Sequence, residues 1–178
     1  MELYTIGHST HSLDYLVGLL RRHEIRQLVD VRIIPASRRL PHFARESLAE
    51  ALPAAGVEYV HLKDLGGRRK PRRNSPNTGW RVGGFRGYAD YMATDRFQAA
   101  LEELIRLGQA LRTSVMCAEA LWWRCHRRLI ADALVARGWE VLHIASDGSL
   151  GRHELTPFAE IREGRVHYPP AQAELIEP

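Results

Sequence analysis

Apolar and polar residues follow two periods along the chain, and together they predict alternating strands and helices. Five short apolar runs have the length expected of buried strands. They occupy residues 3–7, 27–31, 57–62, 113–117 and 140–145. Strands that alternate with helices are typical of a parallel sheet covered on both faces. We therefore expect a single α/β domain over residues 1–178, with a mostly parallel sheet of about five strands and helices on both faces.

Helices are expected where apolar residues recur at helical spacing. The first begins after Ser12, a plausible N-cap, and Asp14 favours its positive end. Another contains Phe97, with Asp95 and Gln98 in capping-box spacing. The remaining helices are expected at residues 45–51, 87–92 and 129–137.

Two segments lack a helical or strand period. Residues 63–86 predict a long basic loop, which in a compact domain is usually functional or mobile. Residues 147–178 predict a C-terminal extension. Within it, residues 158–168 predict a small hairpin, with Glu163 and Gly164 as its two-residue turn.

The composition indicates a soluble globular protein. Apolar residues make up 45% of the 178 residues and charged residues 26%, and no stretch approaches the roughly 20 apolar residues of a membrane span. We expect a cytoplasmic protein without a membrane partner. A disulfide between its two cysteines is conceivable but is not expected in a reducing compartment. The net charge of +4 implies weak attraction to anions and, by itself, no nucleic-acid binding.

Both cysteines lie where a predicted strand passes into a predicted helix, the usual place for ligands in open α/β sheets. Cys117 is a candidate thiolate nucleophile, although an inert buried thiol is the alternative and a nearby Glu119 would raise its pKa. Cys125 and His126 share the inward face of the helix and either pack there or react. A Glu119–His126 pair would suit proton transfer. The catalytic candidates are Cys117, Glu119, Cys125 and His126.

Other strand ends should meet this segment at one edge of the sheet and form a crevice. His8 and Ser9 offer donors before a helix, a reasonable cradle for phosphate or carboxylate. Arg32 either clamps an anion or pairs with a structural carboxylate such as Asp30 or Glu119. The substrate-binding candidates are His8, Ser9, Arg32 and Arg127. We expect no cofactor and no metal, because adjacent Cys and His rarely bind one ion and no second ligand pair exists.

The most basic run lies in the long loop. It contains Arg68, Arg69, Lys70, Arg72 and Arg73, with aromatic residues after it. Clustered cations near aromatic side chains indicate nucleic-acid binding, and a solvated loop of like charges is the alternative. Trp122 and Trp123 either line a pocket for a flat substrate or belong in part to the core.

Several motifs taken together resemble one family. They are Thr5-Ile6-Gly7-His8-Ser9-Thr10, Val29-Asp30-Val31-Arg32 with Pro35 and Ser37, Tyr59-Val60-His61 leading to Leu65-Gly66-Gly67, and Cys117-x-Glu119 with Cys125-His126-Arg127. This pattern resembles the bacterial family called domain of unknown function 488, from residue 4 to about residue 144. The resemblance implies a small single-domain α/β protein and the same site residues, but no reaction.

A weaker, partial likeness to rhodanese-like domains involves residues 28–32, 115–117 and 138–141. In those domains a strand-end cysteine carries sulfur, which implies such a role for Cys117. Here the loop after Cys117 has no glycine and contains Glu119, which is unsuited to a persulfide cradle.

Two functions therefore remain open. The first is an enzyme that acts on an anionic substrate, phosphate-bearing or similar, in the crevice. The second is a nucleic-acid-associated binding module that uses the basic run of residues 68–73.

Overall fold

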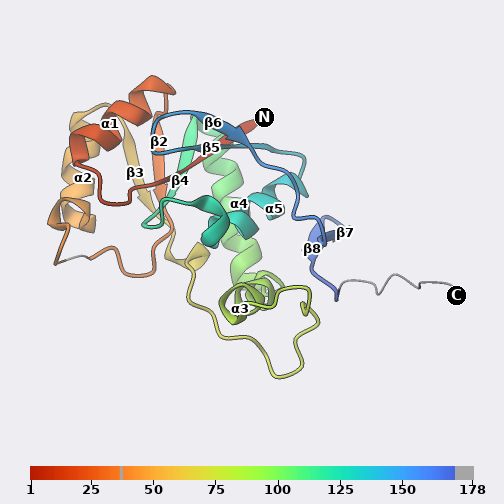
Figure 1. Cartoon of the computed structure of the whole chain (residues 1–178). Helices are drawn as coiled ribbons and strands as arrows, with labels where there is room; N and C mark the ends of the chain where they lie inside the picture. Colours follow the sequence, from red (N-terminus) through yellow and green to blue (C-terminus); the bar gives the residue numbers. More distant parts are fainter. Residues whose placement is uncertain (37, 171–178) are drawn as a thin grey trace, which may run out of the picture.

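The computed structural model describes residues 1–36 and 38–170 and contains a six-stranded sheet (Figure 1). Its strands are β1 (Glu2–Gly7), β2 (Gln27–Asp30), β3 (Glu58–His61), β4 (Thr113–Cys117), β5 (Glu140–Ile144) and β6 (Leu150–Arg152). Their order is β3-β2-β4-β1-β5-β6. The pairs among β1 to β5 are parallel, and β6 runs antiparallel to β5. The α/β prediction is confirmed.

The strand β6 was not among the five expected strands. Its three residues, Leu-Gly-Arg, are all exposed, so they carry none of the apolar alternation that marks a buried strand. Pairing with β5 alone defines it.

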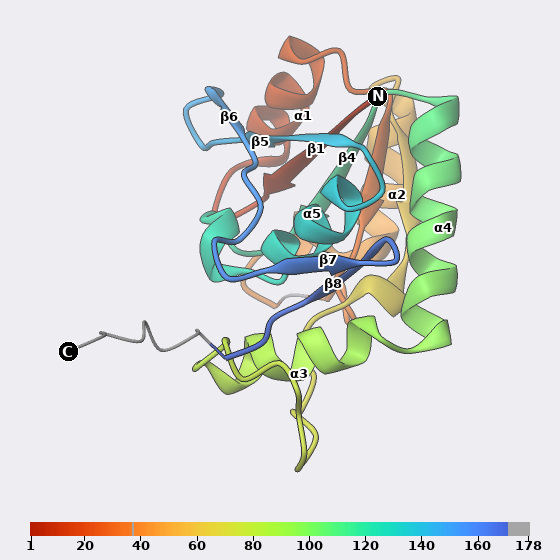
Figure 2. The ribbon, with the colours of Figure 1, turned by 90° about the vertical axis from the view of Figure 1, so that its right-hand side faces the viewer.

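Five α-helices surround the sheet. They are α1 (Leu13–Arg22), α2 (Arg45–Ala54), α3 (Gly83–Met92), α4 (Asp95–Ala110) and α5 (Arg127–Val135), with single 3₁₀ turns η1 (Pro41–Phe43), η2 (Lys63–Leu65) and η3 (Trp122–Arg124). Helices α1 and α2 cover one face, and α4 and α5 cover the other (Figure 1). Helix α3 crosses beyond the end of the sheet, at the foot of α4 (Figure 2).

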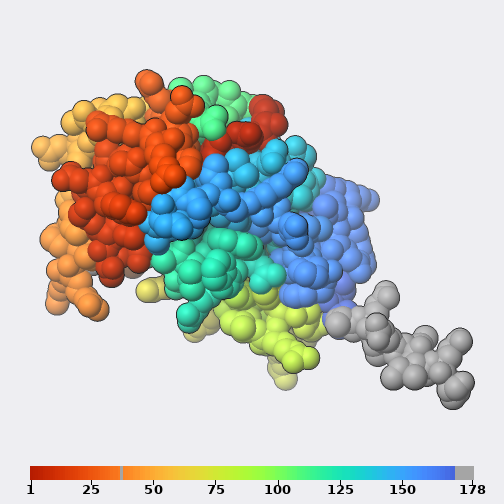
Figure 3. Space-filling model, turned by 45° about the horizontal axis from the view of Figure 1, so that its top comes forward, coloured from red at the N-terminus to blue at the C-terminus, as the bar shows by residue number. Residues whose placement is uncertain are grey.

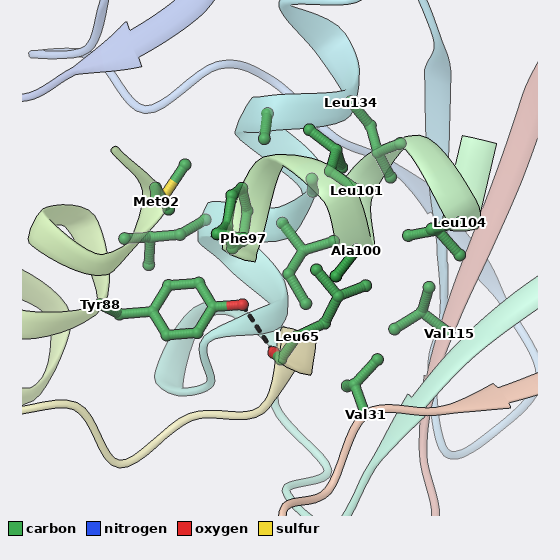
Figure 4. Packing of buried hydrophobic residues seen from close by; sticks show 14 of the residues in the cluster. Val31, Leu65, Tyr88, Met92, Phe97, Ala100, Leu101, Leu104, Val115 and Leu134 are labelled. Carbon is green, nitrogen blue, oxygen red and sulfur yellow. Dashed lines mark hydrogen bonds between the residues drawn. The ribbon is translucent and has the colours of Figure 1, made fainter. Parts of the chain in front are cut away.

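The core on the α4–α5 face reaches the carboxyl edge of the sheet. Val31 and Val115 face Leu65, and Phe97 packs edge-on against Tyr88 (Figure 4). The Tyr88 hydroxyl donates to the Leu65 carbonyl at 2.6 Å. Helix α3 is thus fixed to η2 by apolar burial and by two hydrogen bonds, because the Tyr91 hydroxyl also donates to the Asp64 carbonyl at 2.7 Å.

One predicted helix cap is confirmed and one is wrong. Ser12 accepts from the Tyr15 amide at 3.1 Å, as expected of the N-cap of α1. The capping box from Asp95 to Gln98 does not form. Thr94 is the N-cap of α4 and accepts from the Phe97 amide at 3.3 Å. The cap lies one residue earlier because the Thr94 hydroxyl satisfies that amide.

The predicted basic loop is shorter than residues 63–86 and is anchored to α3. It follows η2 and ends where α3 begins at residue 83. The buried Asp90 carboxylate accepts from the Arg72 amide at 2.8 Å, the Ser75 hydroxyl at 2.6 Å and the Asn77 side chain at 2.9 Å. Three such bonds fix the path of the loop.

The predicted C-terminal hairpin is confirmed. It consists of β7 (Glu160–Arg162) and β8 (Arg165–His167), joined by Glu163 and Gly164. Both turn residues have positive φ, 51° and 71°, as a type I′ turn requires. Of the predicted extension, residues 171–178 lie outside the described residues.

The connection after β4 passes directly over β1 at Gly7. A Cβ at this position would overlap the Glu119 carbonyl oxygen and would lie 2.8 Å from the Ala120 Cα. The His8 and Ser9 amides donate to the carbonyls of Cys117 and Ala118 at 3.0 and 3.1 Å. Only glycine allows this approach, because the obstacle is backbone.

We predict that Gly7→Ala lowers the free energy of unfolding by about 2–3 kcal/mol, the cost of overpacking against an immobile neighbour. Urea denaturation measures the change. Gly18→Ala is the matched control. Gly18 lies within α1 with open space around its Cα, so alanine should stabilise the protein by about 0.5–1 kcal/mol. Equal stability of the Gly7→Ala variant and the wild type would contradict the close approach.

Candidate functional site

A cavity of about 1070 Å³ opens at the carboxyl ends of β1, β2 and β4. Strands β1 and β4 are neighbours, yet the helices that follow them, α1 and α5, lie on opposite faces of the sheet. Such a divergence leaves a crevice, where ligands of α/β sheets bind. The teal β4–α5 connection beside it reaches the surface between the β6 region and the yellow-green segment around α3 (Figure 3).

Most of the candidate residues line this cavity. They are His8, Ser9, Arg32, Cys117, Glu119, Cys125 and His126. Arg68 and Arg124 add exposed cations, and Trp123 adds an exposed ring. Arg127 is absent from the lining because it is almost wholly buried, with 1% of its surface exposed.

The two free cysteines lie side by side at the floor of the cavity. Their Sγ atoms are 2.7 Å apart. Cys117 ends the central strand β4, and Cys125 precedes α5. Both side chains are buried, with 3% and 6% of their surfaces exposed. The end of β4 and the short segment between η3 and α5 therefore hold the two sulfur atoms in contact.

The two thiols differ in acidity. Burial raises the pKa of Cys117, which then serves as the donor of the pair. The hydrogen bond from Cys117 holds the pKa of Cys125 well below its usual range, helped by the His126 Nδ1 at 3.4 Å and by the Arg127 charge. The start of a helix also favours a thiolate. Cys125 is thus the better nucleophile.

Arg127 supports the loop rather than facing the cavity. Its Nη2 donates to the Glu119 carbonyl and, at 3.2 Å, to the Ala120 carbonyl. Within residues 1–36 and 38–170, no carboxylate pairs with it and its buried Nε has no hydrogen-bond partner. A buried cation requires compensation, and the Arg127 charge favours the thiolate form of both Cys117 and Cys125.

Glu119 and His126 are not paired in the described structure. The exposed Glu119 carboxylate accepts from the Leu121 amide at 3.2 Å. His126 lies against Gly67, where a Cβ would come within 2.8 Å of its Nδ1. Its buried Nε2 has no hydrogen-bond partner among the described residues. His126 therefore contacts Cys125 through its Nδ1, and its Nε2 is buried without a partner among the described residues.

Arg32 is held by a structural carboxylate, one of the two alternatives open from the sequence. Its Nε and Nη2 donate to the two Asp30 oxygens at 2.9 and 2.6 Å, and Tyr59 donates to the same carboxylate at 2.8 Å. Nη1 reaches the His8 Nε2 at 3.2 Å. Because Arg32 can only donate, this nitrogen accepts and the His8 Nδ1 carries the proton toward the Ser9 carbonyl.

His8 is neutral at physiological pH. Burial and the Arg32 charge lower its pKa to about 4. The ring stacks on Phe43 at 4.2 Å between centroids. The turn it begins places Ser9 at a positive φ of 49° at the cavity wall. His8 therefore contributes shape and an ordered turn to the site, and no charge.

A family model called domain of unknown function DUF488 matches residues 12–134. The chain belongs to this family. The match includes both cysteines and the residues from Arg32 to Arg127. It begins later and ends earlier than the expected resemblance over residues 4–144. No curated protein and no solved structure matches the chain. The likeness to rhodanese-like domains finds no support.

Within the basic run, Arg69 is packed against the protein and the other four cations are exposed. The Arg69 guanidinium lies 3.6 Å from the centroid of the Tyr91 ring and donates to the Gly66 carbonyl at 3.1 Å. The side chains of Arg68, Lys70, Arg72 and Arg73 are exposed. The two tryptophans are divided as well. Trp123 lines the cavity, whereas Trp122 stacks on His143 at 4.0 Å.

A buried polar chain beneath Trp122 was missed from the sequence. The Thr5 hydroxyl contacts the His143 Nδ1 at 2.7 Å, and the His143 Nε2 contacts the His153 Nδ1 at 3.0 Å. The His153 Nε2 reaches Asp132 at 2.9 Å. Its members come from four separate segments with no common spacing, so no local motif could indicate it.

Among the described residues, no helix is both long enough and apolar enough to cross a membrane.

We predict that acid destabilises the protein partly through His8. Its folded pKa of about 4 lies below the unfolded value of 6.5, so between these pH values the unfolded chain binds more protons. The free energy of unfolding should therefore fall by roughly 1–3 kcal/mol as the pH falls from 6.5 to 4. The measurement is urea denaturation over this range. A His8→Asn variant should show a shallower slope, and an unchanged slope would refute the assignment.

Proposed function

We propose that the protein is an enzyme that uses the Cys125 thiolate as a nucleophile toward an anionic substrate bound in the cavity. One observation carries the proposal. A thiol with its pKa held low by Cys117, His126 and Arg127 lies at the floor of a large crevice. Thiolates stabilised in this way are typical of catalytic cysteines.

The cavity walls favour a substrate with both an anionic and an apolar part. Arg68 and Arg124 bring exposed cations to the lining, which attract a phosphate or carboxylate group. Exposed apolar side chains complete the wall. They are Ile33, Ile34, Val82 and Trp123. Apolar walls with a few placed polar groups are typical of small-molecule sites.

His126 is the candidate for proton transfer beside Cys125. Its Nδ1 contacts the Cys125 sulfur at 3.4 Å, within range for a proton relay to a leaving group. Glu119 instead orders the turn before η3 through the Leu121 amide. Arg32 and Arg127 act as positioning residues, because their donors are used largely by Asp30 and by the Glu119–Ala120 loop.

We predict that Cys125 reacts with iodoacetate far faster than an ordinary thiol does. Its thiolate persists to a lower pH than that of an ordinary thiol, and the cavity cations attract the carboxylate of the reagent. The ratio of the iodoacetate rate to the iodoacetamide rate should exceed that of free cysteine by about tenfold. Peptide mass spectrometry identifies the modified residue, and the rate measured against pH gives the pKa.

Two variants separate the causes. Arg68→Gln combined with Arg124→Gln should reduce the iodoacetate preference and leave the iodoacetamide rate unchanged. Cys117→Ala should raise the pKa of Cys125, because it removes the donor. If Cys125 reacts at every pH as free cysteine does, with both reagents, the proposal fails.

A second function, nucleic-acid binding by the basic loop, is favoured by one observation. Arg68, Lys70, Arg72 and Arg73 are exposed on a loop that Asp90 anchors. Under this function, affinity for single-stranded oligonucleotides falls with salt at a log–log slope of about −3, as expected for four phosphate contacts. Neutralising the four side chains should remove the binding, which fluorescence anisotropy measures. Absence of binding at low salt removes this candidate.

A further inference from the structure

We infer that Cys125 and Cys117 together perform thiol–disulfide exchange on small disulfides that carry carboxylates. The inference rests on the proposed function, in which Cys125 is the nucleophile of an anion-attracting cavity. It adds a role for the second thiol and a class of substrate. Neither follows from family membership.

The geometry provides a second thiol at bonding range. The Sγ atoms are 2.7 Å apart without a bond between them, and both line the same cavity. Cys117 ends the central strand β4, and Cys125 lies in the short segment between η3 and α5. A disulfide therefore requires little rearrangement of the backbone.

The surroundings of the two thiols, together with their acidities, assign the order of attack. Cys125 lies 3.4 Å from the His126 Nδ1, whereas the Cys117 Sγ lies 3.8 Å from the Glu119 carbonyl oxygen. Cys125 has the lowered pKa and is the thiolate that attacks first. Cys117 has the raised pKa and retains its proton until a thiolate leaves. A nucleophile that needed only activation would be served by His126 and Arg127, whereas a thiol in contact with it resolves a mixed disulfide.

The reaction balances in two steps. The Cys125 thiolate attacks one sulfur of a disulfide RS–SR, which forms a Cys125–SR mixed disulfide and releases RS⁻. Cys117 gives its proton to a departing thiolate and attacks the Cys125 sulfur, which forms the Cys117–Cys125 disulfide and releases the second RS⁻. The substrate is reduced by two electrons and the protein is oxidised by two. A dithiol reductant restores both cysteines.

Carboxylate-bearing disulfides fit the lining of the cavity. Arg68 and Arg124 face the mouth, and Trp123 and Ile34 present exposed apolar surface beside them.

Glutathione disulfide, with carboxylates, and hydroxyethyl disulfide, a neutral match, are the probes. With dithiothreitol as reductant, the wild type should turn over glutathione disulfide at least tenfold faster than hydroxyethyl disulfide, relative to the uncatalysed rates. Without reductant, intact mass should show the loss of two hydrogens. Cys117→Ser should instead accumulate one glutathionyl group on Cys125. Cys125→Ser should form neither the internal disulfide nor the glutathionyl adduct. Cys117→Ala repeats the test with a different side chain.

Each outcome decides one point. If Cys125 shows the iodoacetate preference but neither the internal disulfide nor the mixed disulfide forms, exchange is overturned and the nucleophile stands. If both disulfides are turned over equally, the carboxylate-bearing substrate class is overturned. If Cys125 lacks the low pKa and the iodoacetate preference, the proposed function fails first.

Discussion

The close passage of the β4–α5 connection over Gly7 is the constraint on which the candidate site depends. The Glu119 carbonyl occupies the space that any side chain at position 7 would need. Backbone bonds from His8 and Ser9 to Cys117 and Ala118 then join the ends of β1 and β4. With the two strand ends joined, the loop has one path, and that path returns Cys125 to Cys117. The site is thus a consequence of backbone packing before any side-chain chemistry.

Two buried or partly buried arginines near this crossing have different partners. The difference decides which of the two charges can act on the cysteines. Arg32 is paired with the buried Asp30 carboxylate, so its charge is cancelled within the protein. Arg127 meets carbonyls and, among the residues described, no carboxylate. Its charge is therefore available to a thiolate. A carboxylate beside Arg127 would pair with that charge and weaken its effect on both thiols.

Much of the fold follows from local patterns, whereas the contacts of the site do not. Buried strands such as β1 contain closely spaced apolar residues, here Leu3, Tyr4 and Ile6, and Ser12 caps α1 through a bond within one turn. The strand β6 lacks such a signal because its residues are exposed. Parallel strands place their carboxyl ends at one edge of the sheet, so the meeting of His8, Arg32 and Cys117 could be predicted. Which groups then touch depends on packing between segments, so the Glu119–His126 pair could be expected and still not form.

The expectation that a cytoplasmic protein keeps its thiols reduced agrees with a catalytic disulfide, which is transient in such a compartment. The charge around the pair supports this. In the proposed exchange, oxidation would remove a thiolate that the Arg127 charge favours, and the guanidinium would keep its contacts with the Glu119 and Ala120 carbonyls. Interactions that stabilise the dithiol form raise the reduction potential of a disulfide. Under this proposal, the hydrogen bond with Cys117 and the Arg127 charge, which stabilise the Cys125 thiolate, favour the reduced form of the pair, as a couple that turns over requires.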